Sequence, residues 1–283
     1  MMNSQGNILI IGMSRMGKTH FGGQLYGRLK TNTFHYKLGS TPGDLGLFEN
    51  ILQNLNQGLE GRHTDTKLHE TIILPVLSPS GRNLDLVYPE YGGEQLRVLL
   101  EHREINKKWA KGIRDSEHWF LFVRLDMVED VADVTTRFYK QIKEETEVAD
   151  RIVNITDLPE NSSAFYIELL QMFLSVKGAS LSASKKPTLT ILLSCWDKLN
   201  FSLGHLPRKA LEEKMPMFFN FVQSNWRTEN LHIMGLSSLG KDLSGTTPDP
   251  DYALEGPEKF GYLILENGQQ EIDITQVLNS TEA

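Results

Sequence analysis

A glycine-rich segment near the start of the chain has the residue types and the spacing needed to hold phosphate. The apolar run 8–11 precedes the pattern G-x-x-x-x-G-K-T, which extends from Gly12 to Thr19. In such a loop, Gly12 and Gly17 let backbone N–H groups approach phosphate oxygens closely. Lys18 brings a positive charge to the β- and γ-phosphates, and the Thr19 hydroxyl is a ligand for Mg²⁺. The sequence therefore predicts a site for the phosphates of a nucleotide.

Four residues lie between the two glycines, namely Met13, Ser14, Arg15 and Met16. Their side chains are expected to point mostly outward. Arg15 could contact a phosphate or a protein partner, and a solvated arginine is the other interpretation.

A second candidate feature lies where later apolar strands end. The run that begins at Thr190 leads into S-C-W-D, whose last residue is Asp197. A carboxylate can accept two hydrogen bonds from N1 and N2 of guanine, and adenine cannot donate that pair. Taken alone, Asp197 could equally be a solvated carboxylate at a strand end. The next strand also ends in small polar residues, Ser237 and Ser238.

Acidic residues follow two other predicted strands. The segment Glu90-Tyr91-Gly92-Gly93-Glu94 comes after the run 83–88, and Asp126 ends the apolar run 119–125. Carboxylate oxygens are typical ligands of Mg²⁺. Either Glu90 or Asp126 could therefore hold the metal ion beside the phosphate loop.

The elements that must position these residues alternate along the chain. Apolar and β-branched runs predict strands, four-residue apolar spacing predicts helices, and 78–81 reads as a hairpin turn. Strand–helix units with a phosphate loop after the first strand indicate an α/β phosphate-loop NTPase with a mainly parallel sheet and helices on both faces. Strands are expected over 8–12, 70–77, 83–88, 118–125, 188–195, 231–236 and 261–265. Helices are expected over 17–30, 44–57, 94–113, 162–177 and 208–225.

Composition excludes several classes of protein. The 283 residues are 40% hydrophobic and 23% charged, which is ordinary for a globular chain. A net charge of −7 argues against a basic surface for DNA or RNA. No apolar run is long enough to span a bilayer, and the first residues lack the regions of a signal peptide. The single cysteine, Cys195, excludes an internal disulfide, and we expect a cytoplasmic protein.

The order of the motifs resembles that of the small Ras-like GTPases of the TRAFAC class. It is similar in particular to the bacterial double-GTPase-type domains of prokaryotic conflict (antiviral defence) gene clusters. The motifs are G-x-x-x-x-G-K-T, E-Y-G-G-E, L-S-C-W-D-K-L and G-L-S-S-L-G, with Gly261-Tyr262 and Asp273-Ile274-Thr275 near the end. The resemblance spans Ile8 to about Leu278. It implies one Ras-like G domain over 1–283 with insertions around 34–69 and 127–187.

The resemblance also implies roles for individual residues. Glu94 and Lys18 are the implied catalytic residues, and Glu90 stands where the family has aspartate. Glu90 is preferred over Asp126 for the metal because Gly93 and Glu94 follow it in the family's frame. The implied Mg²⁺ ligands are Thr19, Glu90 and the switch I threonine, Thr66, with Thr64 as its alternative. The implied nucleotide contacts are Gly12, Ser14, Arg15, Met16, Gly17, Lys18, Thr19, His20, Gly93, Ser194, Cys195, Asp197, Lys198, Ser237, Ser238 and Leu239.

The reaction that this resemblance implies is attack of water on the γ-phosphate of GTP, which leaves GDP. Glu94 lies where many relatives have glutamine, and its carboxylate would repel the γ-phosphate. We therefore expect slow intrinsic turnover and a protein partner that acts on the switch regions. Two other classes stay open: an ATPase or small-molecule kinase on the same fold, and a scaffold that is stabilised by nucleotide without hydrolysing it.

Overall fold

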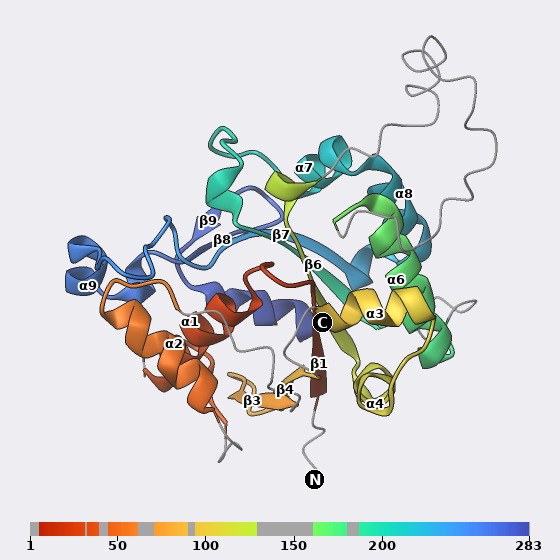
Figure 1. Cartoon of the computed structure of the whole chain (residues 1–283), viewed down its shortest axis with the longest axis horizontal. Coiled ribbons are helices and arrows are strands. Elements are labelled where there is room, and N and C mark those ends of the chain that lie inside the picture. The colour runs from red at the N-terminus through yellow and green to blue at the C-terminus, as the bar shows by residue number, and fades with distance from the viewer. Residues whose placement is uncertain are drawn as a thin grey trace.

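The computed structural model of the chain describes residues 6–31, 33–39, 45–61, 71–89, 94–128, 161–179 and 187–282. Within these ranges the chain forms a nine-stranded sheet with helices on both faces (Figure 1). The strands are β1 (Gly6–Ile11), β2 (Lys37–Leu38), β3 (Ile72–Leu77), β4 (Asn83–Tyr88), β5 (His118–Val123), β6 (Thr188–Ser194), β7 (Leu231–Ser237), β8 (Tyr262–Ile264) and β9 (Gln270–Glu271). The helices are α1 (Lys18–Lys30), α2 (Gly46–Asn56), α3 (Glu94–His102), α4 (Lys107–Asp115), α6 (Ser163–Lys177), α7 (Pro207–Lys214), α8 (Pro216–Asn225) and α9 (Pro250–Glu255).

The sheet has a parallel centre and antiparallel edges. Its strand order is β2-β3-β4-β1-β5-β6-β7-β8-β9, and the five strands from β4 to β7 in this order pair in parallel. The pairs β2–β3, β3–β4, β7–β8 and β8–β9 are antiparallel. Parallel strands place their carboxyl ends at the same edge, where ligands bind in open α/β sheets. The residues that follow β1, β5, β6 and β7 therefore meet at one edge.

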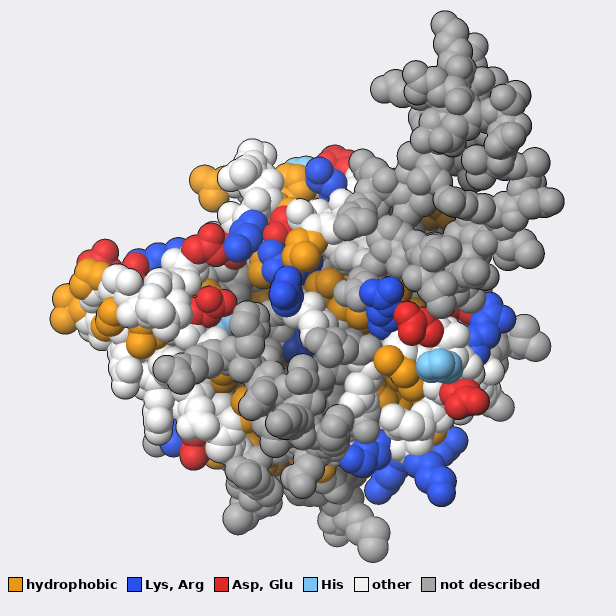
Figure 2. Space-filling view, in the orientation of Figure 1, with side chains coloured by type: hydrophobic (Ala, Val, Ile, Leu, Met, Phe, Trp, Pro, Cys, Tyr) orange, Lys and Arg blue, Asp and Glu red, His pale blue; other side chains and the backbone are white. Residues whose placement is uncertain are grey.

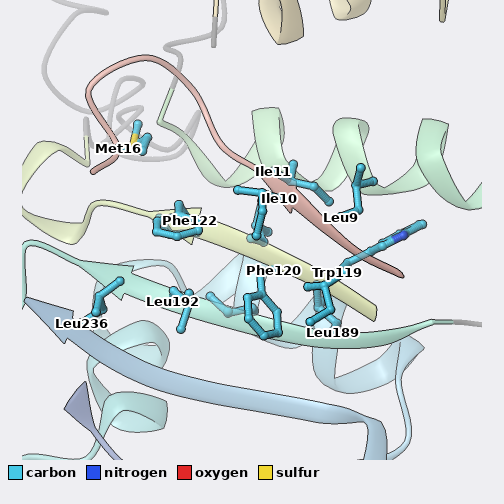
Figure 3. Packing of buried hydrophobic residues seen from close by; sticks show 14 of the residues in the cluster. Leu9, Ile10, Ile11, Met16, Trp119, Phe120, Phe122, Leu189, Leu192 and Leu236 are labelled. Atoms are coloured by element: carbon cyan, nitrogen blue, oxygen red, sulfur yellow. The ribbon is translucent and has the colours of Figure 1, made fainter. Parts of the chain in front are cut away.

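Apolar packing holds this centre rigid. All six residues of β5 are buried, and so are all residues of β6 after the first, as expected for strands covered on both faces. Side chains of β1, β5 and β6, among them Ile10, Phe120 and Leu192, interdigitate in the core (Figure 3). The strands that carry the predicted site residues thus lie in the buried hydrophobic core.

The fold class predicted from sequence is confirmed, and two predicted helices are wrong in their extent. The region 94–113 is divided into α3 and α4, because Arg103 adopts a left-handed conformation with φ 51°. Asn106 then caps α4 by accepting a hydrogen bond from the Trp109 N–H at 3.0 Å. The region 208–225 is divided at Pro216, which has no N–H to continue the hydrogen bonding of α7.

Several elements near the carboxyl end were not predicted. They are α9, β9 and a 3₁₀ helix over Ile274–Thr281. The buried Arg28 of α1 holds this region by donating hydrogen bonds to the backbone carbonyls of Glu258, Gly261 and Ile272 at 2.9, 3.2 and 3.3 Å. The carboxyl-terminal segment is therefore fastened to the helix that follows the phosphate loop.

The predicted insertions around 34–69 and 127–187 stay a prediction, because residues 40–44, 62–70 and 129–160 lie outside the described ranges. In the part of the chain that the structure describes, no helix has both the length and the apolar composition for crossing a membrane.

Acid is expected to destabilise the fold through His118, the first residue of β5. Burial is the largest of the causes that lower the pKa of His118 from 6.5 to about 4, and the charges of Arg82 and His232 contribute to the same lowering. Between these two values the unfolded chain binds a proton that the folded chain does not, so the free energy of unfolding falls as the pH falls. The difference between the two pKa values corresponds to about 3 kcal/mol in the free energy of unfolding. This stability is fully present above the pKa of His118 in the unfolded chain and is lost as the pH falls toward 4.

Urea unfolding at about pH 7 and about pH 5 checks this expectation. His118→Gln should lose most of the difference between the two conditions. His102→Gln, at an exposed position, is the matched control and should retain it. The same pH dependence in His118→Gln as in the wild type would contradict the prediction.

Candidate nucleotide-binding site

The phosphate loop spans residues 12–17 and joins β1 to α1. Gly17 has a left-handed conformation with φ 80°, and its carbonyl accepts the hydrogen bond from Phe21 N–H at 2.9 Å that starts the helix. The Lys18 ammonium lies back across the loop and donates to the carbonyls of Gly12 and Met13, each at 2.6 Å. A Cβ at Gly12 would lie 3.0 Å from the Cβ of Phe122, so a larger residue here would require Phe122 of β5 to shift. The loop has the shape that its motif predicts.

Lys18 is held in a setting that disfavours its own charge. Burial lowers the pKa of Lys18 from 10.5 to about 7. Two carbonyl dipoles contact the ammonium, but no carboxylate among the described residues pairs with it. A bound phosphate would stabilise the charged form through Coulomb attraction. The site is therefore electrostatically incomplete without an anion.

The sequence predicted that the side chains of the loop point mostly outward. The structure corrects this prediction for two of the four residues. Met13 and Met16 are 1% and 3% exposed and belong to the hydrophobic core, so only their backbone can contact a nucleotide. Ser14 is partly exposed and Arg15 is exposed. The correction has a simple cause: the loop lies directly on the core, and two apolar side chains anchor it there.

Arg124, which the sequence analysis gave no role, holds the loop from outside. Its Nη1 donates to the Arg15 carbonyl at 3.0 Å, and its Nε donates to Asp126 Oδ1 at 3.0 Å. Nη2 contacts the other oxygen of Asp126 at 2.5 Å. Both oxygens of Asp126 are thus engaged by one guanidinium, which makes this residue a structural partner and a poor candidate for the metal. The spacing Arg-x-Asp after an apolar strand was the available signal for this pair.

The segment that follows β6 lies next to the phosphate loop. A Cβ at Gly17 would be 3.8 Å from the Cβ of Ser194, and the buried Ser194 hydroxyl faces the Val123 carbonyl of β5 at 3.4 Å. Cys195 adopts a left-handed conformation with φ 55° and starts a 3₁₀ turn over Trp196–Lys198. Burial raises the pKa of the Cys195 thiol to about 11, so it is not a nucleophile at neutral pH.

Asp197 is oriented by a residue of the next strand. The buried Ser237 hydroxyl donates to Asp197 Oδ1, and it accepts a hydrogen bond from the Gly240 N–H at 2.9 Å. Ser237 therefore fixes one oxygen of the partly exposed Asp197 carboxylate. Because the carboxylate is planar and rigid, the direction of its second oxygen is then defined as well. The sequence placed Ser237 among the nucleotide contacts, and its hydrogen bond to Asp197 was not predicted.

Neighbouring residues fix the turn that carries Asp197. Trp196 is 8% exposed and packs against Phe201 with ring centroids 5.2 Å apart. A Cβ at Gly235 would lie 2.7 Å from the Trp196 ring, so the small residue makes room for the indole. The Lys198 ammonium pairs with Asp242 at 2.7 Å. Ser238 is buried, and Leu239 packs against a small cluster around Tyr252.

The predicted switch residues fall mostly outside the part of the chain that the structure describes. Thr64, Thr66, Glu90 and Gly93 lie outside the described residues, and Glu94 is described only as the first residue of α3. In the described ranges no group of three or more His, Cys, Asp or Glu side chains could hold a metal ion. Of the predicted Mg²⁺ ligands, Thr19 is the one that lies within the described residues. It belongs to the first turn of α1, beside Lys18 and His20. A single hydroxyl suits Mg²⁺, which is commonly held by few protein ligands together with phosphate oxygens and water.

Solved structures with some similarity to the chain include several GTPases. The Arl6 BBS3 small GTPase from Trypanosoma brucei, with a bound nucleotide analogue GppNp, has a TM-score of 0.40 and 10% identity over 86% of this chain and 90% of that one. A signal recognition particle receptor complex, SRb-GTP/SRX from Chaetomium thermophilum, has a TM-score of 0.40 and 13% identity over 85% and 94%. The GTP-bound Ski7 GTPase-like domain of S. cerevisiae has a TM-score of 0.38 and 14% identity over 87% and 46%. Similarity at this level assigns no residue a role.

No curated protein matches the chain. A family model does: the model of Double-GTPase 1 matches residues 9–281, which include the phosphate loop, Asp197 and the 3₁₀ helix near the carboxyl end. The Ras-like topology of the sheet and the positions of the motifs agree with that match. The chain therefore belongs to the Double-GTPase 1 family.

Proposed function

We propose that this chain is a switch protein that binds GTP and GDP with Mg²⁺ and slowly hydrolyses GTP. The observation that carries the proposal is the hydrogen bond from Ser237 to Asp197, at the same sheet edge as the phosphate loop. A carboxylate held in one orientation can receive the paired donors of guanine, and adenine has no such pair. The alternative of a freely solvated Asp197 is less consistent with this contact.

In this proposal each residue of the site has a distinct task. Lys18 and the backbone N–H groups of residues 14–19 bind the β- and γ-phosphates. Asp197 selects the base. Thr19, together with Glu90 and Thr66, would hold Mg²⁺, which neutralises charge on the phosphates when bound. Glu90 is preferred over Asp126 because both oxygens of Asp126 are bonded to Arg124.

We assign to Glu94 the orientation of the attacking water. A carboxylate can accept a hydrogen bond from water, but its charge repels the γ-phosphate, which favours slow turnover until a partner orders the switch regions. The resemblance to domains of prokaryotic conflict gene clusters supports placing this switch in a bacterial defence system.

Glu94→Ala is expected to slow GTP hydrolysis by about 10- to 1000-fold while leaving GTP affinity nearly unchanged, because the residue acts on water and not on the nucleotide. Single-turnover hydrolysis of GTP and ATP, with product GDP or ADP quantified, is the measurement. Glu104→Ala, at an exposed position after α3, is the matched control.

Three outcomes are distinguishable. GTP turnover that drops in Glu94→Ala and persists in the control supports the proposal. Turnover of ATP in preference to GTP would select an ATPase or kinase. Tight GTP binding with no hydrolysis by the wild type, also with a partner present, would select a nucleotide-stabilised scaffold.

A further inference from the structure

The backbone of Arg15 is held in a conformation that arginine does not favour. Its φ is 63°, in the left-handed region, which is unfavourable for a residue other than glycine, asparagine or aspartate. Its carbonyl is bonded to Arg124 Nη1 at 3.0 Å, and Arg124 is fixed in turn by Asp126. Glycine would fit this conformation without strain. The local geometry of the loop therefore does not explain an arginine here.

The side chain of Arg15 does not stabilise the fold through any described contact. It is exposed, and within the described ranges its guanidinium makes no hydrogen bond or ion pair. Other cations that follow the strands at this edge are neutralised: Arg124 by Asp126, Lys198 by Asp242 at 2.7 Å and Lys241 by Asp249 at 2.7 Å. In Figure 2, red and blue side chains adjoin at a few places on the described surface. Arg15 thus brings an uncompensated charge to the loop that binds phosphate.

We propose that Arg15 is a catalytic residue whose guanidinium stabilises, within the same chain, the charge on the γ-phosphoryl group during GTP hydrolysis. This inference rests on the proposed function. Water adds to the γ-phosphorus, the bond to the oxygen that bridges it to GDP breaks with its electron pair going to GDP, and the proton of the water passes to the released phosphate. A planar guanidinium can donate two hydrogen bonds to the oxygens on which charge collects.

Two features of the loop make this role physically reasonable. Lys18 lies on the inner side, bonded to the carbonyls of Gly12 and Met13, whereas Arg15 is on the exposed side three residues earlier. The two cations can therefore approach one phosphate chain from different directions. Arg124 acts as a positioning residue, because it fixes the carbonyl of Arg15 and hence the direction in which the side chain leaves the loop.

The test compares wild type, Arg15→Ala and Arg15→Lys in single-turnover GTP hydrolysis. An arginine that stabilises the transferring phosphoryl group contributes about 10³- to 10⁵-fold in known cases. We expect a loss of at least about 100-fold in Arg15→Ala, little rescue by lysine, and GDP affinity within about threefold of wild type. Arg114→Ala, at an exposed position of α4, is the control for loss of a surface charge.

A second readout does not depend on turnover. Titration of the GDP-bound protein with aluminium fluoride, which mimics the transferring phosphoryl group, should show binding in wild type and in Arg114→Ala and none in Arg15→Ala. Equal hydrolysis rates and equal fluoride binding in wild type and Arg15→Ala would overturn the inference and leave the proposed function intact. The Lys18→Ala protein keeps Arg15 but is expected not to bind GTP. Recovery of the hydrolysis rate when Arg15→Ala is mixed with Lys18→Ala would show that Arg15 acts on the nucleotide of another chain, and would overturn its action within one chain. Absence of GTP hydrolysis in wild type, also with a partner present, would overturn both this inference and the hydrolysis in the proposed function.

Discussion

Lys18→Ala is expected to lower the affinity for GTP by at least about 100-fold. The lysine would contribute charge-assisted hydrogen bonds to two phosphates, and each such bond is worth about 1.5–3 kcal/mol. The fold should persist, because burial already lowers the pKa of Lys18 to about 7 and so disfavours its charge in the absence of an anion. Removal of the ammonium should therefore not lower the free energy of unfolding.

Calorimetric titration with GTP, together with thermal unfolding in the presence and absence of GTP, measures both effects. Wild type should show a GTP-dependent rise in melting temperature, and Lys18→Ala should not. Lys30→Ala, at the exposed end of the same helix, is the matched control. Unchanged GTP affinity in a folded Lys18→Ala protein would contradict the assignment of the phosphate loop.

Asp197→Asn is expected to change the preferred base from guanine to xanthine. The loss of two charge-assisted hydrogen bonds to guanine should weaken GTP binding by about 2–4 kcal/mol, which is about 30- to 1000-fold. An amide can donate where the carboxylate accepts, so xanthosine triphosphate, which has a carbonyl in place of the guanine amino group, should bind the variant more tightly than wild type. The Ser237 hydroxyl can donate to the new amide oxygen, so the turn should keep its shape.

Competition of GTP and xanthosine triphosphate for a fluorescent guanine nucleotide gives both affinities. Asp242→Asn, which removes a nearby exposed carboxylate that pairs with Lys198, is the control and should keep the wild-type preference. An unchanged ratio of the two affinities in Asp197→Asn would show that the carboxylate does not contact the base.

The phosphate half of the site was predictable because its parts are contiguous in sequence. One strand, six loop residues and the start of α1 carry most of its described contacts, and the others come from Phe122, Arg124 and Ser194. Arg124 was missed because its partner in the loop is the backbone of Arg15, and a backbone carbonyl leaves no trace in a motif. The preference for Glu90 over Asp126 as a metal ligand gained a structural reason only from the ion pair between Arg124 and Asp126, which the sequence did not predict.

The part of the site that would bind the base could be predicted from the sequence only in outline. Asp197 could be proposed from its position after a strand, but its hydrogen bond to Ser237 spans 40 residues and depends on the parallel pairing of β6 with β7. Helix extents were overestimated for a different reason. The apolar spacing continues across Arg103 and Pro216, whereas the backbone changes direction at both. The short strands β2 and β9 have two residues each, too few for a periodic pattern.

The central claim is that this member of the Double-GTPase 1 family recognises guanine nucleotides. The most direct measurement is competition of GTP, GDP and ATP, each with Mg²⁺, for a fluorescent guanine nucleotide bound to the wild-type protein. GTP and GDP should displace the label with similar affinities, and ATP should require at least about a hundredfold higher concentration. Displacement by ATP at the same concentration as GTP would contradict the claim.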